Sequence, residues 1–122
     1  MTFALWMILV AGFLPWATTG LAKSGGFDNR APRDWVNTLT GWRQRADWAH
    51  RNHFEAFPIF AAAVLTASLI HAPQGRVDVL AGAFVLFRLA YTGAYIADRA
   101  TLRSVAWFGG VICVVGLFAA GV

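Results

Sequence analysis

Four apolar stretches take up most of the sequence, at about residues 2–22, 54–70, 77–97 and 105–122. A helix needs about 20 apolar residues, with a range of about 17–25, to cross the roughly 30 Å hydrocarbon core of a bilayer. All four stretches reach this length, and the rest of the sequence connects them. We therefore expect an all-α integral membrane four-helix bundle in one domain over residues 1–122, with helices at about 2–22, 35–70, 77–97 and 103–122.

The composition agrees with a membrane protein and argues against nucleic acid as a partner. Hydrophobic residues make up 58% of the chain and charged residues only 13%, whereas about a quarter of a soluble domain is charged. The Lys and Arg residues cluster near the ends of the expected helices, with Arg88 as the exception, and not along an amphipathic face. No basic residue precedes the first apolar stretch, so we interpret it as a retained helix and not as a signal peptide.

The basic residues are distributed unequally between the two sides of the membrane. The two links that follow the first and third stretches contain Lys23, Arg30, Arg33, Arg43, Arg45, Arg51, Arg99 and Arg103. Only Arg76 lies in the link on the opposite side. Because cytoplasmic loops carry an excess of Lys and Arg, this distribution predicts that both basic links face the cytoplasm and both termini lie outside it.

The long link between the first two stretches has two parts. Residues 23–34 are rich in Gly, Pro and polar residues, which is typical of a loop, and Asp34 is a candidate N-cap for the helix that follows. Residues 35–52 mix Trp with Arg, as segments at a membrane interface do. The second helix is therefore expected to begin between Trp35 and Trp42, well outside the bilayer.

The first polar group lies where the second helix enters the membrane. Helical spacing places Arg45, Asn52 and Glu55 near one face, and Arg51 lies four residues before Glu55. A carboxylate near the hydrocarbon boundary is costly unless it is paired. Spacing alone leaves two interpretations open, an interfacial ion pair that anchors the helix and a binding site.

The second polar group lies within the third helix, where Arg88, Tyr91 and Tyr95 share one face. Arg88 is close to the midplane of its span, where an Arg costs about 2.5–3.5 kcal/mol. Such a residue has to face the bundle interior or a subunit interface. Glu55 is its candidate partner, so a purely structural Arg–Glu clamp also remains open.

The third polar group, Arg103 and Ser104, lies at the start of the fourth helix. The backbone N–H groups of a helix N-terminus bind anions, although capping and membrane orientation alone also explain these residues. Together the three groups predict a pocket for a small anion at the cytoplasmic end. No metal site is predicted, because His50 and His53 have no third ligand nearby.

Two segments resemble the MAPEG family, the membrane-associated proteins in eicosanoid and glutathione metabolism, and in particular its short bacterial members. The first is similar to the signature that opens the family's second helix, and it contains Arg45, Arg51, Asn52, Glu55 and Pro58. The second is similar to the family's segment from the third helix to the fourth, and it contains Arg88, Tyr91, Tyr95, Arg103 and Ser104.

The resemblance implies a membrane-bound glutathione-dependent transferase or peroxidase that acts on lipophilic electrophiles. Glutathione, as co-substrate, would be held between the subunits of a homotrimer by Arg51, Asn52, Glu55, Arg88, Tyr91 and Tyr95. Arg103 and Ser104 would be catalytic, because the family uses an Arg or Ser here to stabilise the glutathione thiolate. The resemblance to bacterial members also implies a multi-pass protein of the bacterial inner membrane, and the distribution of basic residues then predicts periplasmic termini and a cytoplasmic long loop.

Two other functions are compatible with the sequence. A non-catalytic protein of the MAPEG fold would bind another small anion or a lipid. A small multidrug transporter also has four helices, but it needs a membrane-embedded carboxylate in the first helix, and no ionisable side chain precedes Lys23 here. Tyr91 stands where the most similar mammalian branch has a histidine and Trp107 where it has a tyrosine, which argues against eicosanoid synthesis.

Overall fold

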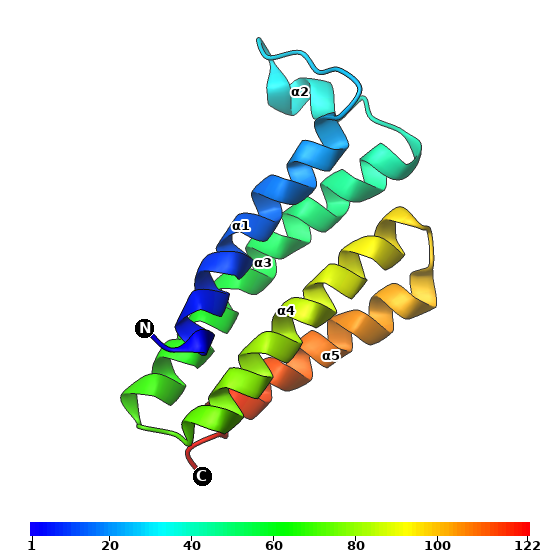
Figure 1. The fold of residues 1–122 in the computed structure, drawn as a ribbon. Helices are drawn as coiled ribbons and strands as arrows, with labels where there is room; N and C mark the ends of the chain where they lie inside the picture. Colours follow the sequence, from blue (N-terminus) through cyan, green and yellow to red (C-terminus); the bar gives the residue numbers. More distant parts are fainter.

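The computed structural model describes all of residues 1–122 and consists of helices joined by short links, without strands. Its five helices are α1 (Phe3–Lys23), α2 (Pro32–Val36), α3 (Gly41–Leu69), α4 (Gln74–Ile96) and α5 (Ala100–Phe118). The four long helices form a bundle in which α1 lies beside α3 and α4 beside α5 (Figure 1). Both termini lie at one end of the bundle and α2 at the other (Figure 1). The predicted all-α class is confirmed.

The prediction of one continuous helix over residues 35–70 is wrong, because this segment is divided into α2 and α3. The Thr38 hydroxyl donates to the Trp35 carbonyl at 2.7 Å, a local bond that competes with helix continuation. Gly41, the first residue of α3, has φ +63°, a conformation that glycine adopts at little cost. Asp34 lies in the first turn of α2 and does not cap α3, whose N-cap position is Thr40.

Three helices, α1, α4 and α5, are long and apolar enough to cross a membrane. Of the four predicted spanning stretches, three are therefore confirmed by length and composition. The longest helix, α3, has a first half rich in charged and polar residues, and its apolar part begins only near Ala56. This apolar part packs against α1 and α4, so it lies at the same level as the spanning helices (Figure 1).

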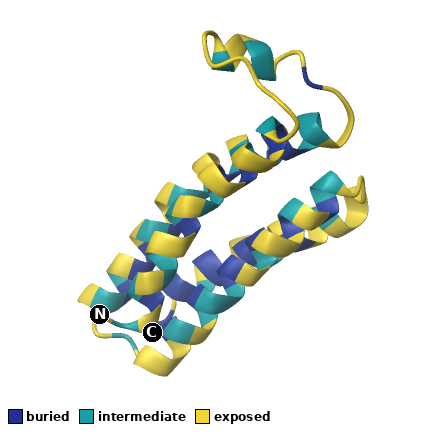
Figure 2. Cartoon of the chain, turned by 45° about the horizontal axis from the view of Figure 1, so that its top comes forward, coloured by how far each residue is buried: buried dark blue, intermediate teal, exposed yellow.

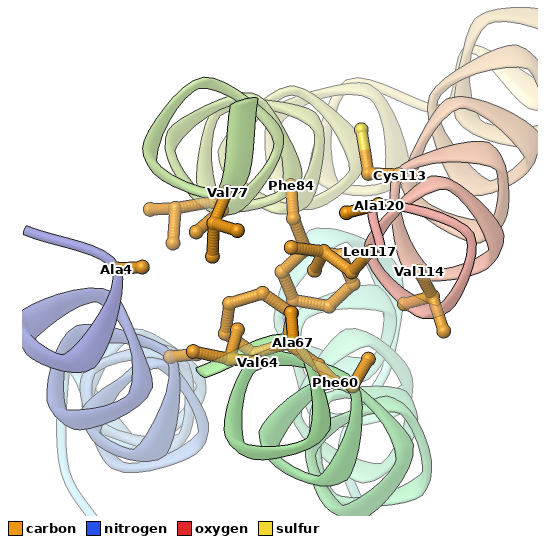
Figure 3. Close-up of a cluster of buried hydrophobic side chains, with 14 residues drawn as sticks. Ala4, Phe60, Val64, Ala67, Val77, Phe84, Cys113, Val114, Leu117 and Ala120 are labelled. Atoms are coloured by element: carbon orange, nitrogen blue, oxygen red, sulfur yellow. The ribbon is translucent and has the colours of Figure 1, made fainter. Parts of the chain in front are cut away.

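The main hydrophobic core lies toward the end of the bundle that holds the termini. The rings of Phe60 from α3 and Phe84 from α4 stack with centroids 3.9 Å apart, and Val77 and Leu117 pack around them (Figure 3). Many of the remaining core residues are Ala, such as Ala67. Small residues let helix backbones approach closely, which is how helices associate in a membrane.

Side chains from neighbouring helices satisfy backbone groups that the helix ends leave free. Asp78 of α4 accepts a hydrogen bond from the Ala4 N–H at the start of α1, at 2.9 Å. Arg45 of α3 donates to the carbonyl of Ile96 at the end of α4, at 3.1 Å. No buried side-chain polar atom lacks a partner. Such pairing is needed where no water reaches the backbone.

The exposed residues lie mainly on the outer sides of the bundle (Figure 2). They include large apolar side chains such as Trp6, Leu86 and Ile112. In a soluble protein an apolar surface of this extent would drive association, but in a bilayer it contacts lipid or another subunit.

One close helix contact gives a testable expectation for stability. A Cβ atom at Gly109 of α5 would lie 2.4 Å from the Phe87 ring of α4, so Gly109→Ala requires the Phe87 ring or one of the two helices to move. We expect it to lower the free energy of unfolding by about 1–3 kcal/mol, the usual cost of overpacking. Gly93→Ala in α4 is the control, because nothing lies within 4 Å of its added methyl group.

The Gly93→Ala variant should unfold at the wild-type temperature or slightly above it, since Ala favours the helix by about 0.5–1 kcal/mol over Gly. Circular dichroism of the detergent-solubilised proteins during heating measures both variants. Equal unfolding temperatures for the two variants would contradict the close α4–α5 contact.

Candidate functional site

Arg88 is at the centre of the candidate site. Its helix buries Val77, Ala81, Phe84, Arg88 and Tyr91 in a spacing of four and three residues, so Arg88 points into the bundle and is only 2% exposed. Nη2 donates to Asn52 Oδ1 at 2.9 Å, and Nε donates to His53 Nδ1 at 3.2 Å. Neither partner is charged, so Arg88 forms no ion pair.

The direct Arg88–Glu55 pair anticipated from the sequence is not formed. Asn52 lies between the two charges, because its Oδ1 accepts from Arg88 while its Nδ2 donates to Glu55 Oε2 at 2.8 Å. The Glu55 side chain is exposed on α3, and its carboxylate is held by the Asn52 amide. The amide therefore connects a buried cation to a carboxylate at the surface.

His53 is a site residue that the sequence did not predict. It is 3% exposed, and its Nε2 lies 2.8 Å from the Thr92 hydroxyl. One signal in the sequence could have identified it. Ala46, His53, Phe60 and Ala67 are all buried and recur every seven residues, so His53 lies on the interior face of α3.

Two tyrosines and a second arginine continue the site toward the α2 end. The Arg88 Cζ lies 4.4 Å from the Tyr91 ring centroid, and the Arg103 Cζ lies 4.7 Å from that of Tyr95. The two rings meet edge to face, with centroids 5.5 Å apart. Cation–π contacts thus hold both guanidinium groups against the aromatic pair. The Arg103 side chain makes no hydrogen bond or ion pair, so its N–H groups are free for a ligand.

Two adjoining cavities open beside these residues. A polar cavity of about 290 Å³ is lined by Asn52, Tyr91, Tyr95, Arg103, Ser104, Trp107 and Phe108. A mainly apolar cavity of about 320 Å³ continues along α3 and α5, and is lined by Asn52, Glu55, Ala56, Ile59, Phe84, Arg88, Trp107, Gly110, Val111, Val114 and Val115. The shared walls at Asn52 and Trp107 make the two cavities neighbours. The structure thus gathers every predicted site residue except Arg51.

Arg51 points away from this site. Its Nε donates to Asp47 Oδ2 at 2.9 Å and its Nη2 donates to Asn37 Oδ1 at 3.2 Å, so the expected contact with Glu55 is replaced by one toward α2. Helical side chains lean toward the N-terminus, which favours an acidic partner four residues before the arginine. Arg51 lines a separate cavity of about 540 Å³ between α1, α2 and α3, together with Lys23 and Arg33.

Comparison with known protein families supports the resemblance seen in the sequence. The model of the MAPEG family matches residues 3–122, almost the whole chain. A search of curated proteins gives no match. The family match agrees with three helices that are long and apolar enough to cross a bilayer, so the protein is a multi-pass membrane protein. The chain belongs to the MAPEG family.

Proposed function

We propose that this protein is a glutathione-dependent transferase or peroxidase that acts on lipophilic electrophiles. The observation that carries the proposal is the free guanidinium of Arg103, which lies against Tyr95 on the wall of a polar cavity. Ser104 lines the same cavity. A cation without an ion-pair or hydrogen-bond partner in such a place is suited to an anionic ligand, and glutathione is the ligand that the family resemblance implies.

The site offers groups that complement each part of glutathione. Arg88 and Arg103 provide positive charge for carboxylate and thiolate groups, and the exposed Glu55 provides negative charge for the ammonium group. A free thiol has a pKa of about 8.5, and a nearby cation lowers it. Arg103 and the Ser104 hydroxyl would therefore raise the fraction of thiolate, which is the attacking nucleophile. Its sulfur forms a bond to the electrophilic carbon as the leaving group departs.

The apolar cavity is suited to the second substrate. Most of its lining residues are apolar side chains of α3, α4 and α5, and it adjoins the polar cavity at Asn52 and Trp107. A lipophilic electrophile could thus reach the thiolate from the hydrocarbon region without crossing water. Holding both reactants in adjoining cavities makes their encounter effectively unimolecular.

A homotrimer, with glutathione between neighbouring subunits, is the assembly that we propose. It would explain how Arg51 can belong to the glutathione site although it lines a different cavity from Arg103 within one chain. Arg51 of one subunit would then complete the site of the next. We further propose that the α2 end faces the cytoplasm of a bacterial cell and the termini face the periplasm, because the basic links lie at the α2 end.

The proposal is tested on the detergent-purified protein with three measurements on one preparation. Calorimetry should detect glutathione binding, a chlorodinitrobenzene assay should detect conjugation, and native mass spectrometry should give the mass of three chains. Binding without turnover would favour a non-catalytic anion-binding member of the family, which the unpaired charge of buried Arg88 would also suit. No binding at millimolar glutathione would refute the proposed function.

A further inference from the structure

A closed ring of hydrogen bonds begins and ends on Arg88. The guanidinium donates to His53 Nδ1, from Nε at 3.2 Å and from Nη2 at 3.1 Å. On the other side of the imidazole, Nε2 lies 2.8 Å from the Thr92 hydroxyl. That hydroxyl donates to the backbone carbonyl of Arg88 at 3.0 Å. The side chain of Arg88 is thus connected through two other residues to its own main chain.

The direction of each bond in this ring is determined by chemistry. A guanidinium has donors only, so His53 Nδ1 must be the acceptor and its proton must be on Nε2. The Thr92 hydroxyl already donates to a carbonyl, which has no proton to offer, so the same oxygen accepts from Nε2. The imidazole of His53 is therefore neutral and adopts a single tautomer.

The ring leaves one part of the guanidinium free. Nε and Nη2 are held by His53 and Asn52, whereas Nη1 makes no hydrogen bond; because every fully buried polar atom has a partner, Nη1 is not fully buried. Arg88 also lines the apolar cavity, together with Asn52 and Glu55. A flexible arginine side chain loses rotamer entropy when it binds a ligand. An arginine whose rotamer is already fixed loses little of it, and a neutral imidazole fixes it without placing another charge in the bundle.

We propose that His53 is a positioning residue that fixes the Arg88 guanidinium for the carboxylate of a bound ligand, and that Thr92, by accepting from Nε2, stabilises the tautomer that Arg88 requires. The inference rests on the proposed function for the identity of the ligand, glutathione. His53 does not touch the ligand and transfers no proton, because both ring nitrogens are occupied within the bundle. Its contribution reaches the ligand through Arg88 alone.

Two matched pairs of variants separate positioning from simple packing. His53→Asn retains an acceptor near the place of Nδ1, whereas His53→Leu removes it. Thr92→Ser retains the hydroxyl, whereas Thr92→Val removes it at almost constant volume. His71→Asn is the control, because His71 is exposed at the opposite end, makes no side-chain hydrogen bond and has φ +54°, which asparagine tolerates.

We expect His53→Leu and Thr92→Val to weaken glutathione binding about tenfold, as loss of a hydrogen bond to a charged group does. His53→Asn and Thr92→Ser should stay within about threefold of wild type, and His71→Asn should equal it. The KM for glutathione should rise while the KM for chlorodinitrobenzene stays constant. A purely structural role would instead change both KM values and the unfolding temperature. Wild-type binding by His53→Leu would overturn the proposal.

A spectroscopic measurement makes the outcome independent of the ligand. Nuclear magnetic resonance of protein labelled with ¹⁵N at histidine, with the His53 signal assigned by its loss in His53→Asn, should show a protonated Nε2 and an unprotonated Nδ1. In Thr92→Val the Nδ1-protonated form should appear. If wild type does not bind glutathione, the proposed function fails. The tautomer of His53 then remains the test of whether His53 positions Arg88. Protonation of Nδ1 in wild type would overturn it.

Discussion

Replacing Arg103 with Ala is expected to slow glutathione conjugation by about tenfold to a hundredfold. Removing a charge-assisted hydrogen bond costs about 1.5–3 kcal/mol, and about 1.4 kcal/mol corresponds to a factor of ten in rate. The fold should be retained, because the side chain makes no hydrogen bond or ion pair and lies partly exposed against Tyr95. The pH at which the rate increases should also be higher in Arg103→Ala than in wild type, since the thiol of bound glutathione would ionise less readily.

The control for this experiment is Arg99→Ala. Arg99 has the same charge, lies four residues earlier and is exposed in the link before α5, away from both cavities. It should keep wild-type binding and rate. Arg103→Lys should recover part of the rate, because an ammonium group supplies the charge but not the planar fork of donors. Equal binding and equal rates for Arg103→Ala and wild type would refute the thiolate role of Arg103.

The helices and the faces of the site were predictable because they depend on local periodicity. Apolar length set the approximate positions of α1, α4 and α5. Spacings of three and four residues placed Arg88, Tyr91 and Tyr95 on one face of α4, where the structure has them lining adjoining cavities. The break between α2 and α3 was missed because it depends on the backbone conformation of Gly41, which an aromatic and basic pattern does not reveal.

The choice of hydrogen-bond partner was less predictable than the choice of face. Arg51 has an acidic residue four positions away on either side, Asp47 and Glu55, and the orientation rule for helical pairs would have selected Asp47. For Arg88 the sequence offers Glu55 as the one carboxylate within reach. The neutral acceptors of Asn52 and His53 satisfy it instead, and this depends on how α3 and α4 pack, which the periodicity of each helix does not contain.

Replacing Arg88 with Met is expected to abolish glutathione binding while changing the stability of the unliganded protein by less than about 1 kcal/mol. Two opposing terms of similar size produce this result. Removing an arginine from near mid-span removes a cost of about 2.5–3.5 kcal/mol for placing its charge in the membrane. The loss leaves His53 Nδ1 without its donor, and a buried unsatisfied group costs about 1–3 kcal/mol. The cost at Asn52 is smaller, because its side chain is partly exposed and still donates to Glu55.

The measurement is thermal unfolding in detergent with and without glutathione, because a ligand that binds only the folded state raises the unfolding temperature. Arg88→Met should lose this rise, whereas the control Arg76→Met should keep it. Arg76 donates to the Ala120 carbonyl at the opposite end of the bundle, at 3.1 Å. If Arg88→Met unfolded far below wild type but still responded to glutathione, Arg88 would be a structural clamp. Wild-type stability without a rise in unfolding temperature on adding glutathione would mean that Arg88 serves ligand binding and not the stability of the bundle.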